Sequence, residues 1–256
     1  VMGSHATGSG AWCSGPEDIS PPEYFWGYNR MTSVEGLFGA GDAVGGTPHA
    51  FSSGSFTEGR LAAKAACKYI DDGKGEGIVV SEAQINRRKE EIYKPLEHYR
   101  IYRNAIVAGD VNPHYINPKQ GLDRLQKLMD EYCGGVTVNY MTNEKLLNIG
   151  LKKLAIMEED LENLAAKDVH ELLRAWELKH RHRAAECVTQ HTLFRKETRW
   201  PGYYYRGDAM KVDDENWHVL TVSRRDPKTG EYTMEKAPCY HLVADEKQPA
   251  QEQAHA

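Results

Sequence analysis

The segment Thr32–Asp42, with the sequence TSVEGLFGAGD, decides the expected fold. A short apolar strand is predicted over residues 36–40, and it runs through small residues to Asp42. A glycine-rich strand end lets the backbone approach a ligand closely, because no Cβ stands in the way. The carboxylate of Asp42 is then placed to accept hydrogen bonds from sugar-type hydroxyls. The alternative for a single aspartate is a turn or helix-capping role.

The segment Pro48–Gly59, PHAFSSGSFTEG, places small and hydroxyl residues where a helix is expected to begin. We predict this helix from about Ser55 to Ile70, because small and apolar residues recur there at spacings of three and four. A helix N-terminus presents unpaired N–H groups and a partial positive charge. Ordinary capping by a serine gives the same pattern, so this feature alone does not identify a ligand.

Composition excludes several classes of protein. The chain has 256 residues, a net charge of −5 and a sequence pI of about 6.1, so nothing in its charge favours nucleic acid or an anionic membrane. No apolar run reaches the roughly 20 residues that span a bilayer. The start lacks the features of a signal peptide, and Val1 opens inside a strand-to-loop pattern. We therefore expect the C-terminal part of a longer protein.

The five cysteines are scattered, and no CxxC occurs. This pattern favours neither a zinc site nor an iron–sulfur cluster in this chain. Free thiols in a reducing cytoplasm are expected.

From residue 81 the pattern becomes helical, and four amphipathic helices predict a bundle. Capping boxes are expected at Ser81 with Gln84 and at Asp168 with Glu171, and Pro95 is expected to kink its helix. Leu172, Leu173 and Trp176 are expected to form the apolar side of the last helix. The predicted helices cover residues 81–102 and 117–133, a segment from Asn143 with Leu147, Leu151, Leu154 and Leu161 on one stripe, and a segment after Asp168.

The last part of the chain is aromatic and irregular. Two strands are predicted at Val219–Arg224 and Glu231–Glu235, joined by a turn-rich connector. The polar tail from Ala244 is expected to be disordered.

Three histidine-containing segments are further candidates for chemistry. His5 lies between small residues and could donate a proton or hydrogen bond to an anionic substrate, although a lone histidine is more often structural. His49 has the same two interpretations. The basic cluster Lys179–Arg183 resembles a metal or phosphate site, but the solvated last turns of a helix explain it better.

Three segments together resemble the fumarate reductase/succinate dehydrogenase flavoprotein superfamily, and within it the adenylylsulfate reductases. They are VMGSHATGSGAWCSGP, TSVEGLFGAGDAVGGTPHAFSSGSFTEGRLAAKAA and DDENWHVLT. The resemblance implies an α+β fold, in which the C-terminal part of a two-segment FAD-binding domain precedes a helical bundle domain and a small irregular/β region. It assigns residues 1–79 to the FAD-binding domain, 80–191 to the helical domain, 192–243 to an aromatic region for partner docking, and 244–256 to a tail.

The resemblance also implies the cofactor and its contacts. FAD is expected, with the nucleotide-binding GxGxxG half outside this chain. His5 falls on the active-site histidine of the adenylylsulfate reductases, and Asp42 falls on the acidic residue that binds the ribityl chain. A helix start facing the flavin ring would stabilise the negative charge of the reduced ring. The residues implied to bind the cofactor are Gly41, Asp42, Ser53, Gly54, Ser55 and Phe56.

The implied reaction is the reduction of adenylyl sulfate to sulfite and AMP in a cytoplasmic enzyme. Electrons would come from an iron–sulfur beta subunit with two [4Fe-4S] clusters. Fumarate reductases carry a catalytic arginine in a segment like HGANRLGG, whereas PHAFSSGS here has none, which argues against a dicarboxylate substrate. The alternatives are a fumarate reductase or aspartate oxidase relative, and a non-catalytic helical interaction module.

Overall fold

The structure is a computed structural model that describes residues 9–45, 52–105, 112–199 and 204–239. The chain divides into two compact units, Val1–Gln84 and Ile85–Ala256. Each unit is described by itself. His5, His49 and the tail from Ala244 lie outside the described residues.

The first unit is a layer of extended chain beside one long helix, α1 (Ser52–Asp71). Two short 3-10 turns precede α1, η1 (Pro22–Tyr24) and η2 (Gly41–Ala43). Within the described residues, the extended chain of this unit forms isolated bridges and no regular sheet: Met31 pairs with Phe38 in an antiparallel bridge, and Ala11 pairs with Val44 in a parallel one. The predicted strand over residues 36–40 is therefore wrong as regular structure. Gly36 has φ +76° and reverses the chain directly before Phe38, so a single bridge replaces the strand.

Helix α1 begins at Ser52 rather than at Ser55, and its apolar face is the predicted one. Ala65 and Tyr69 are buried on that face. The ring of Tyr69 meets the edges of Tyr28 and Phe38, with ring centroids 5.2 Å and 5.9 Å apart. Aromatic edge contacts of this kind add to area burial and fix α1 against the extended chain.

The second unit is built on the helices α2 (Glu82–Tyr102), α3 (Pro118–Tyr132), α4 (Glu144–Leu161) and α5 (Val169–Phe194). Local capping explains where they start. Ser81 and Gln84 form the predicted capping box, with Ser81 N–H donating to Gln84 Oε1 at 2.8 Å. At the start of α5, only one of the two hydrogen bonds of the predicted Asp168–Glu171 capping box is present. Asp168 accepts from Glu171 N–H at 2.9 Å, but the Glu171 carboxylate accepts from Lys167 N–H rather than from the Asp168 amide.

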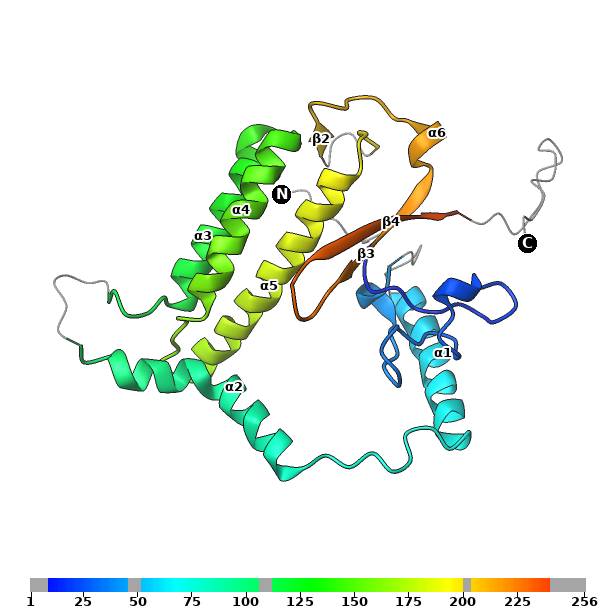
Figure 1. The fold of residues 1–256 in the computed structure, drawn as a ribbon, viewed down its shortest axis with the longest axis horizontal. Helices are drawn as coiled ribbons and strands as arrows, with labels where there is room; N and C mark the ends of the chain where they lie inside the picture. The colour runs from blue at the N-terminus through cyan, green and yellow to red at the C-terminus, as the bar shows by residue number, and fades with distance from the viewer. Residues whose placement is uncertain (1–8, 46–51, 106–111, 200–203, 240–256) are drawn as a thin grey trace. The chain divides into compact units, whose positions relative to one another are not determined.

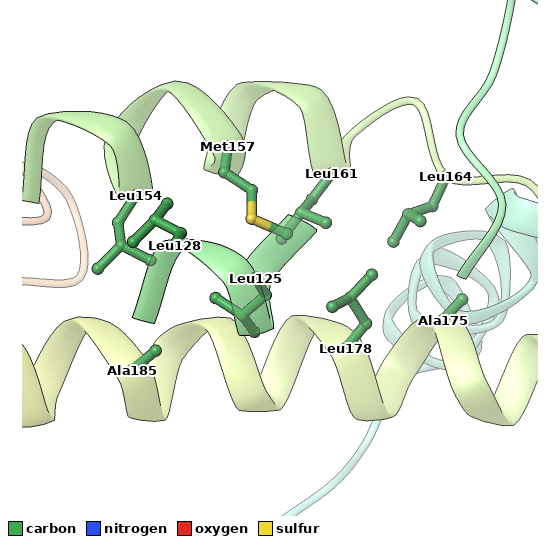
Figure 2. Packing of buried hydrophobic residues seen from close by; sticks show 9 residues of the cluster. All are labelled: Leu125, Leu128, Leu154, Met157, Leu161, Leu164, Ala175, Leu178 and Ala185. Carbon is green, nitrogen blue, oxygen red and sulfur yellow. The ribbon is translucent and has the colours of Figure 1, made fainter. Parts of the chain in front are cut away.

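Helices α3, α4 and α5 enclose the core of this unit (Figure 2). Leu154 is fully buried and Met157 is 1% exposed. Burying each such side chain contributes roughly 1.5–3 kcal/mol. The leucine stripe of α4 is thus confirmed. On α5, Leu172 is buried as predicted, but Leu173 is 57% exposed, and Ala175 and Leu178 are buried instead. The cluster comprises Leu125, Leu128, Leu154, Met157, Leu161, Leu164, Ala175, Leu178 and Ala185.

Helix α2 is not a fourth member of the bundle. Its first half is exposed on every side, and only the part around Pro95 meets the other helices. Pro95 O accepts from Ala166 N–H at 2.9 Å, and Ile92 O accepts from the Trp176 indole N–H at 3.0 Å. Pro95 lies inside the helix as expected, and the axis of α2 changes direction in Figure 1.

Small elements complete the second unit. They are η3 (Val136–Val138), the two-residue parallel pair β1 (Met141–Thr142) and β2 (Tyr205–Arg206), α6 (Asp214–Trp217), and the antiparallel hairpin of β3 (Val219–Arg225) and β4 (Tyr232–Pro238). The hairpin confirms the two predicted strands and packs on α5, beside which it runs in Figure 1. None of the helices within the described ranges combines the length and apolarity that crossing a membrane requires.

The basic cluster Lys179–Arg183 lies in the middle of α5, because this helix continues to Phe194. Its placement in the solvated last turns was therefore wrong. His182 is 2% exposed, and its Nε2 lies 2.8 Å from the carbonyl oxygen of Leu154. Arg183 pairs with Glu158 and Glu186. Among the described residues no group of three His, Cys, Asp or Glu side chains could hold a metal ion, so the cluster is structural.

Candidate functional site

The candidate site begins where two extended segments of the first unit run side by side. Ala11 N–H donates to Ala43 O at 2.8 Å, and Gly45 N–H donates back to Ala11 O at 3.0 Å. A Cβ on Gly10 would lie 2.7 Å from Ala43 O, so this approach requires glycine at position 10. The pairing fixes the chain that directly follows Asp42.

The turn η2 presents the predicted carboxylate. Gly41 has φ +65°, a conformation that side chains with a Cβ rarely adopt, and a Cβ there would lie 3.2 Å from Ser55 Oγ. Gly41 is buried, whereas Asp42 is exposed. The chain thus turns tightly at Gly41 and directs an acidic residue to the surface of the unit.

The first turn of α1 lies against η2. Ser53 is exposed, Gly54 and Ser55 are half-buried, and the ring of Phe56 is 77% exposed. No acidic residue occupies this first turn, so the partial positive charge of the helix end is not neutralised within it. The arrangement brings a surface carboxylate, a glycine turn and a helix N-terminus to one place.

A carboxylate of α1 holds the turn in position. Glu58 is 5% exposed, and its Oε2 accepts the backbone N–H of Gly41 at 2.8 Å. Its Oε1 lies 3.4 Å from Arg30 Nη2. Sequence reasoning missed both residues. The signal was present, because Glu58 is in helical register with Leu61, Ala65 and Tyr69, on the side of α1 that faces the unit's interior.

The chain is similar to known proteins over most of its length. Residues 122–253 match the sequence profile of the family described as Fumarate reductase flavoprotein C-term. The chain belongs to this family. It is 41% identical over 95% of its length to the adenylylsulfate reductase subunit alpha of Megalodesulfovibrio gigas, of which it covers 37%.

Two solved structures are similar to this family member over most of its length. One is the adenylylsulfate reductase of Archaeoglobus fulgidus, with 51% identity and a TM-score of 0.86. The other is described as an adenosine-5-phosphosulfate reductase in complex with sulfite (covalent adduct), with 50% identity and a TM-score of 0.85. Both similarities cover 92% of the chain and 37% of the solved chain. The chain therefore spans little more than a third of the relatives it matches.

The residues of the first unit fit the flavin that this flavoprotein family implies. A Cβ at Gly41 would lie 3.2 Å from Ser55 Oγ, so glycine lets the turn pack closely against the start of α1 and leaves Asp42 beside it on the surface. Asp42 supplies acceptor oxygens only, which suits a polyol chain, and the start of α1 supplies backbone donors. Gly41, Asp42 and Ser55 are brought together, with Ser53, Gly54 and Phe56 on the same end of α1.

A thiol lies behind the turn. A Cβ on Gly39 would lie 2.6 Å from Cys13 Sγ, so the thiol packs directly against the chain that leads to Gly41. Burial raises the pKa of Cys13, although the nearby Arg30 acts in the opposite direction. A neutral, half-buried thiol is a packing group rather than a nucleophile. All five cysteines of this family member are free.

The second unit holds a groove of a different kind. It has a volume of about 480 Å³ and lies between the start of α3 and one face of α5. Four of its charged side chains form two pairs, Lys119 with Asp123 at 2.8 Å and Arg174 with Glu177 at 2.7 Å. Ligand sites are mostly apolar with a few convergent polar groups. We therefore interpret this groove as a solvent-exposed gap between two helices that does not bind a ligand, and we place the candidate site in the first unit.

Proposed function

We propose that this chain is the C-terminal part of the FAD-binding catalytic subunit of an adenylylsulfate reductase. The observation that carries the proposal is the 41% identity to an adenylylsulfate reductase alpha subunit over 95% of the chain. The Gly41–Asp42 turn against the start of α1 supports it, because this turn presents groups that suit the ribityl chain and ring of a flavin.

The reaction that we propose reduces adenylyl sulfate by two electrons. The bond between sulfur and the bridging oxygen of the AMP phosphate breaks, the sulfur leaves as sulfite, and AMP keeps the bridging oxygen. FAD supplies the two electrons when it is bound. Asp42 accepts hydrogen bonds from the ribityl hydroxyls, and backbone N–H groups at the start of α1 favour negative charge on the ring.

His5 is the proposed catalytic residue of this chain. It lies outside the described residues, so the proposal rests on its place in the segment Met2–Ala6 and on the resemblance of that segment. An imidazole can donate a proton or a hydrogen bond to the anionic substrate and can stabilise the leaving phosphate. The other basic groups that such a site requires would lie in the remainder of the subunit.

Electrons would enter from a partner in the cytoplasm. The five cysteines are scattered through the sequence without a CxxC, so the chain offers no cluster motif of its own. We propose an iron–sulfur beta subunit with two [4Fe-4S] clusters as the donor, docked on residues 192–243.

Within this docking region, Trp217 is buried beneath Lys236, whose Nζ lies 3.7 Å from the ring centroid, so this aromatic residue stabilises the region internally. Exposed apolar side chains such as Met210 and Val212 are the candidates for the contact.

The test uses the complete flavoprotein subunit with its partner. Purified protein should show flavin absorbance, should release sulfite and AMP from adenylyl sulfate with a reduced electron donor, and should lose flavin absorbance when sulfite is added. A fumarate reductase relative would instead reduce fumarate rapidly and ignore adenylyl sulfate. A folded protein without flavin absorbance would overturn the proposal and favour the non-catalytic helical interaction module.

A further inference from the structure

The turn that carries Asp42 does not hold itself in place. Only three residues form η2, and the backbone bond within the turn runs from Val44 N–H to Gly41 O at 3.0 Å, while Ala11 holds the end at Ala43. The N–H of Gly41 takes no part in that bond and is buried. A buried N–H needs an acceptor, and in this unit the acceptor is the side chain of Glu58, which lies 17 positions later in the chain.

We propose that Glu58 is a positioning residue for flavin binding: it fixes the Gly41–Asp42 turn so that the Asp42 carboxylate meets the ribityl chain. The proposal rests on the proposed function, because Asp42 needs a flavin to act on. Glu58 itself is buried at the back of the turn and touches the backbone of Gly41, not the exposed side of Asp42.

Two residues on one face of α1 lie against the turn, and Glu58 is the one that bonds to it. Ser55 and Glu58 are three positions apart, so their side chains are neighbours on the helix surface. Ser55 Oγ lies 3.2 Å from the position of a Cβ on Gly41, and Glu58 Oε2 lies 2.8 Å from the Gly41 nitrogen. The part of α1 that is proposed to face the flavin therefore also holds Gly41, the residue before Asp42.

Arg30 provides the counter-charge for the buried carboxylate. Its guanidinium is 3.4 Å from Glu58 Oε1, and its backbone O accepts from Gly39 N–H at 2.9 Å. Its Nε is buried without a hydrogen-bond partner among the described residues, so the ion pair is not bidentate. Of the two contacts of Glu58, the bond to Gly41 is the shorter. For holding the turn, the length of the Glu58 side chain, which brings its oxygen to Gly41 N–H, should therefore matter more than its negative charge.

Two conservative variants separate reach from charge. Glu58→Gln keeps an oxygen at the same distance and loses the charge, whereas Glu58→Asp keeps the charge and is one methylene too short. The control is Lys64→Ala, which removes an exposed charge from the same helix. The readouts are the Kd of FAD for the apoprotein of the complete subunit, from flavin fluorescence, and the Tm of the apoprotein.

Glu58→Ala is expected to weaken FAD binding about tenfold, Glu58→Asp by nearly as much, and Glu58→Gln by less than about threefold, with Lys64→Ala unchanged. In an Asp42→Ala background, Glu58→Asp should have little further effect, because both changes act through one contact. Equal FAD affinity in the Gln and Asp variants, or full additivity with Asp42→Ala, would overturn the positioning role. Failure of the unmodified subunit to bind FAD would instead overturn the proposed function, whatever the variants do.

Discussion

Arg206 and Asp208 form a bidentate ion pair, with Nε 2.9 Å from Oδ1 and Nη2 3.0 Å from Oδ2. The free edge of the guanidinium donates through Nη1 to carbonyl oxygens at the end of α5, among them Arg195 O at 2.8 Å. Asp208 Oδ2 accepts the N–H of Glu144 at the start of α4. Hydrogen bonding to Arg206 lowers the pKa of Asp208 to about 2. This pair therefore joins the end of one core helix to the beginning of another.

Replacing Arg206 should be strongly destabilising. Its side chain is 1% exposed, so Arg206→Met would remove the guanidinium donors from Asp208 and from several carbonyl oxygens. We expect a loss of about 3–5 kcal/mol in the free energy of unfolding, measured by urea denaturation. The matched control is Arg224→Met, which breaks an exposed pair with Glu235 and should cost less than about 1 kcal/mol. Similar losses for the two variants would contradict the structural role of Arg206.

His191 should make stability depend on pH. Its Nδ1 lies 3.0 Å from Thr221 Oγ1 and its Nε2 2.9 Å from Ser223 Oγ, which joins α5 to the hairpin. Burial, and secondarily the charge of Arg195, lowers the pKa of His191 below its ordinary value of 6.5. The unfolded chain therefore binds the proton more readily, so stability is fully present above pH 6.5 and falls as the pH drops toward the folded-state pKa.

Urea denaturation between pH 7.5 and roughly pH 5 checks this expectation. The His191→Gln variant should lose part of the slope in that window, since the amide does not titrate. The exposed His180 gives the control, and His180→Gln should keep the slope of the unmodified protein. An unchanged slope in His191→Gln would rule out this histidine as the source.

Leucines on α4 and α5 should differ sharply in their contribution to the core. Leu154 is fully buried in the α3–α4–α5 cluster, whereas Leu173 is 57% exposed. Leu154→Ala should cost about 2–5 kcal/mol of unfolding free energy, from lost transfer energy and the cavity left behind. Leu173→Ala should stay within about 0.5 kcal/mol. Thermal and urea unfolding measure both, and a costly Leu173→Ala would mean that a further surface covers this face.

Asp42→Ala should reduce FAD retention in the complete subunit. Loss of a charge-assisted hydrogen bond corresponds to roughly 1.5–3 kcal/mol, which is a tenfold or larger rise in the Kd of FAD. Asp18→Ala, which removes another exposed aspartate of the first unit, is the control. The ratio of flavin to protein absorbance measures the effect. Unchanged flavin content in Asp42→Ala would remove Asp42 from the cofactor site.

His5→Ala should slow turnover of adenylyl sulfate while FAD stays bound. A proton or hydrogen-bond donor in the transition state typically contributes 10²–10⁴-fold to the rate. Sulfite release in steady state measures turnover, and flavin absorbance shows that the site is still loaded. Normal turnover in this variant would place His5 outside the active site.

Local sequence signals predicted the elements of this protein with good accuracy. Asn117 and Gln120 form a capping box at the start of α3, and Asn143 caps α4, because a cap is made by residues three positions apart. The β3–β4 hairpin follows from the same locality, since Gly230 with φ +77° and the Asp226 carboxylate complete its turn. Such contacts need no information from distant parts of the chain.

Long-range contacts decided the rest. Helix α2 stayed outside the bundle, and the basic cluster of α5 turned His182 inward, because each outcome depends on which distant surface is available.

The sequence by itself therefore determined the helices, the hairpin and a glycine-rich segment that leads to an acidic residue, since periodicity and capping act over a few positions. Only the tertiary structure showed that Glu58 holds Gly41 and that Arg206 joins two helices. A buried charge can be placed only where its partners have already been brought together by the fold.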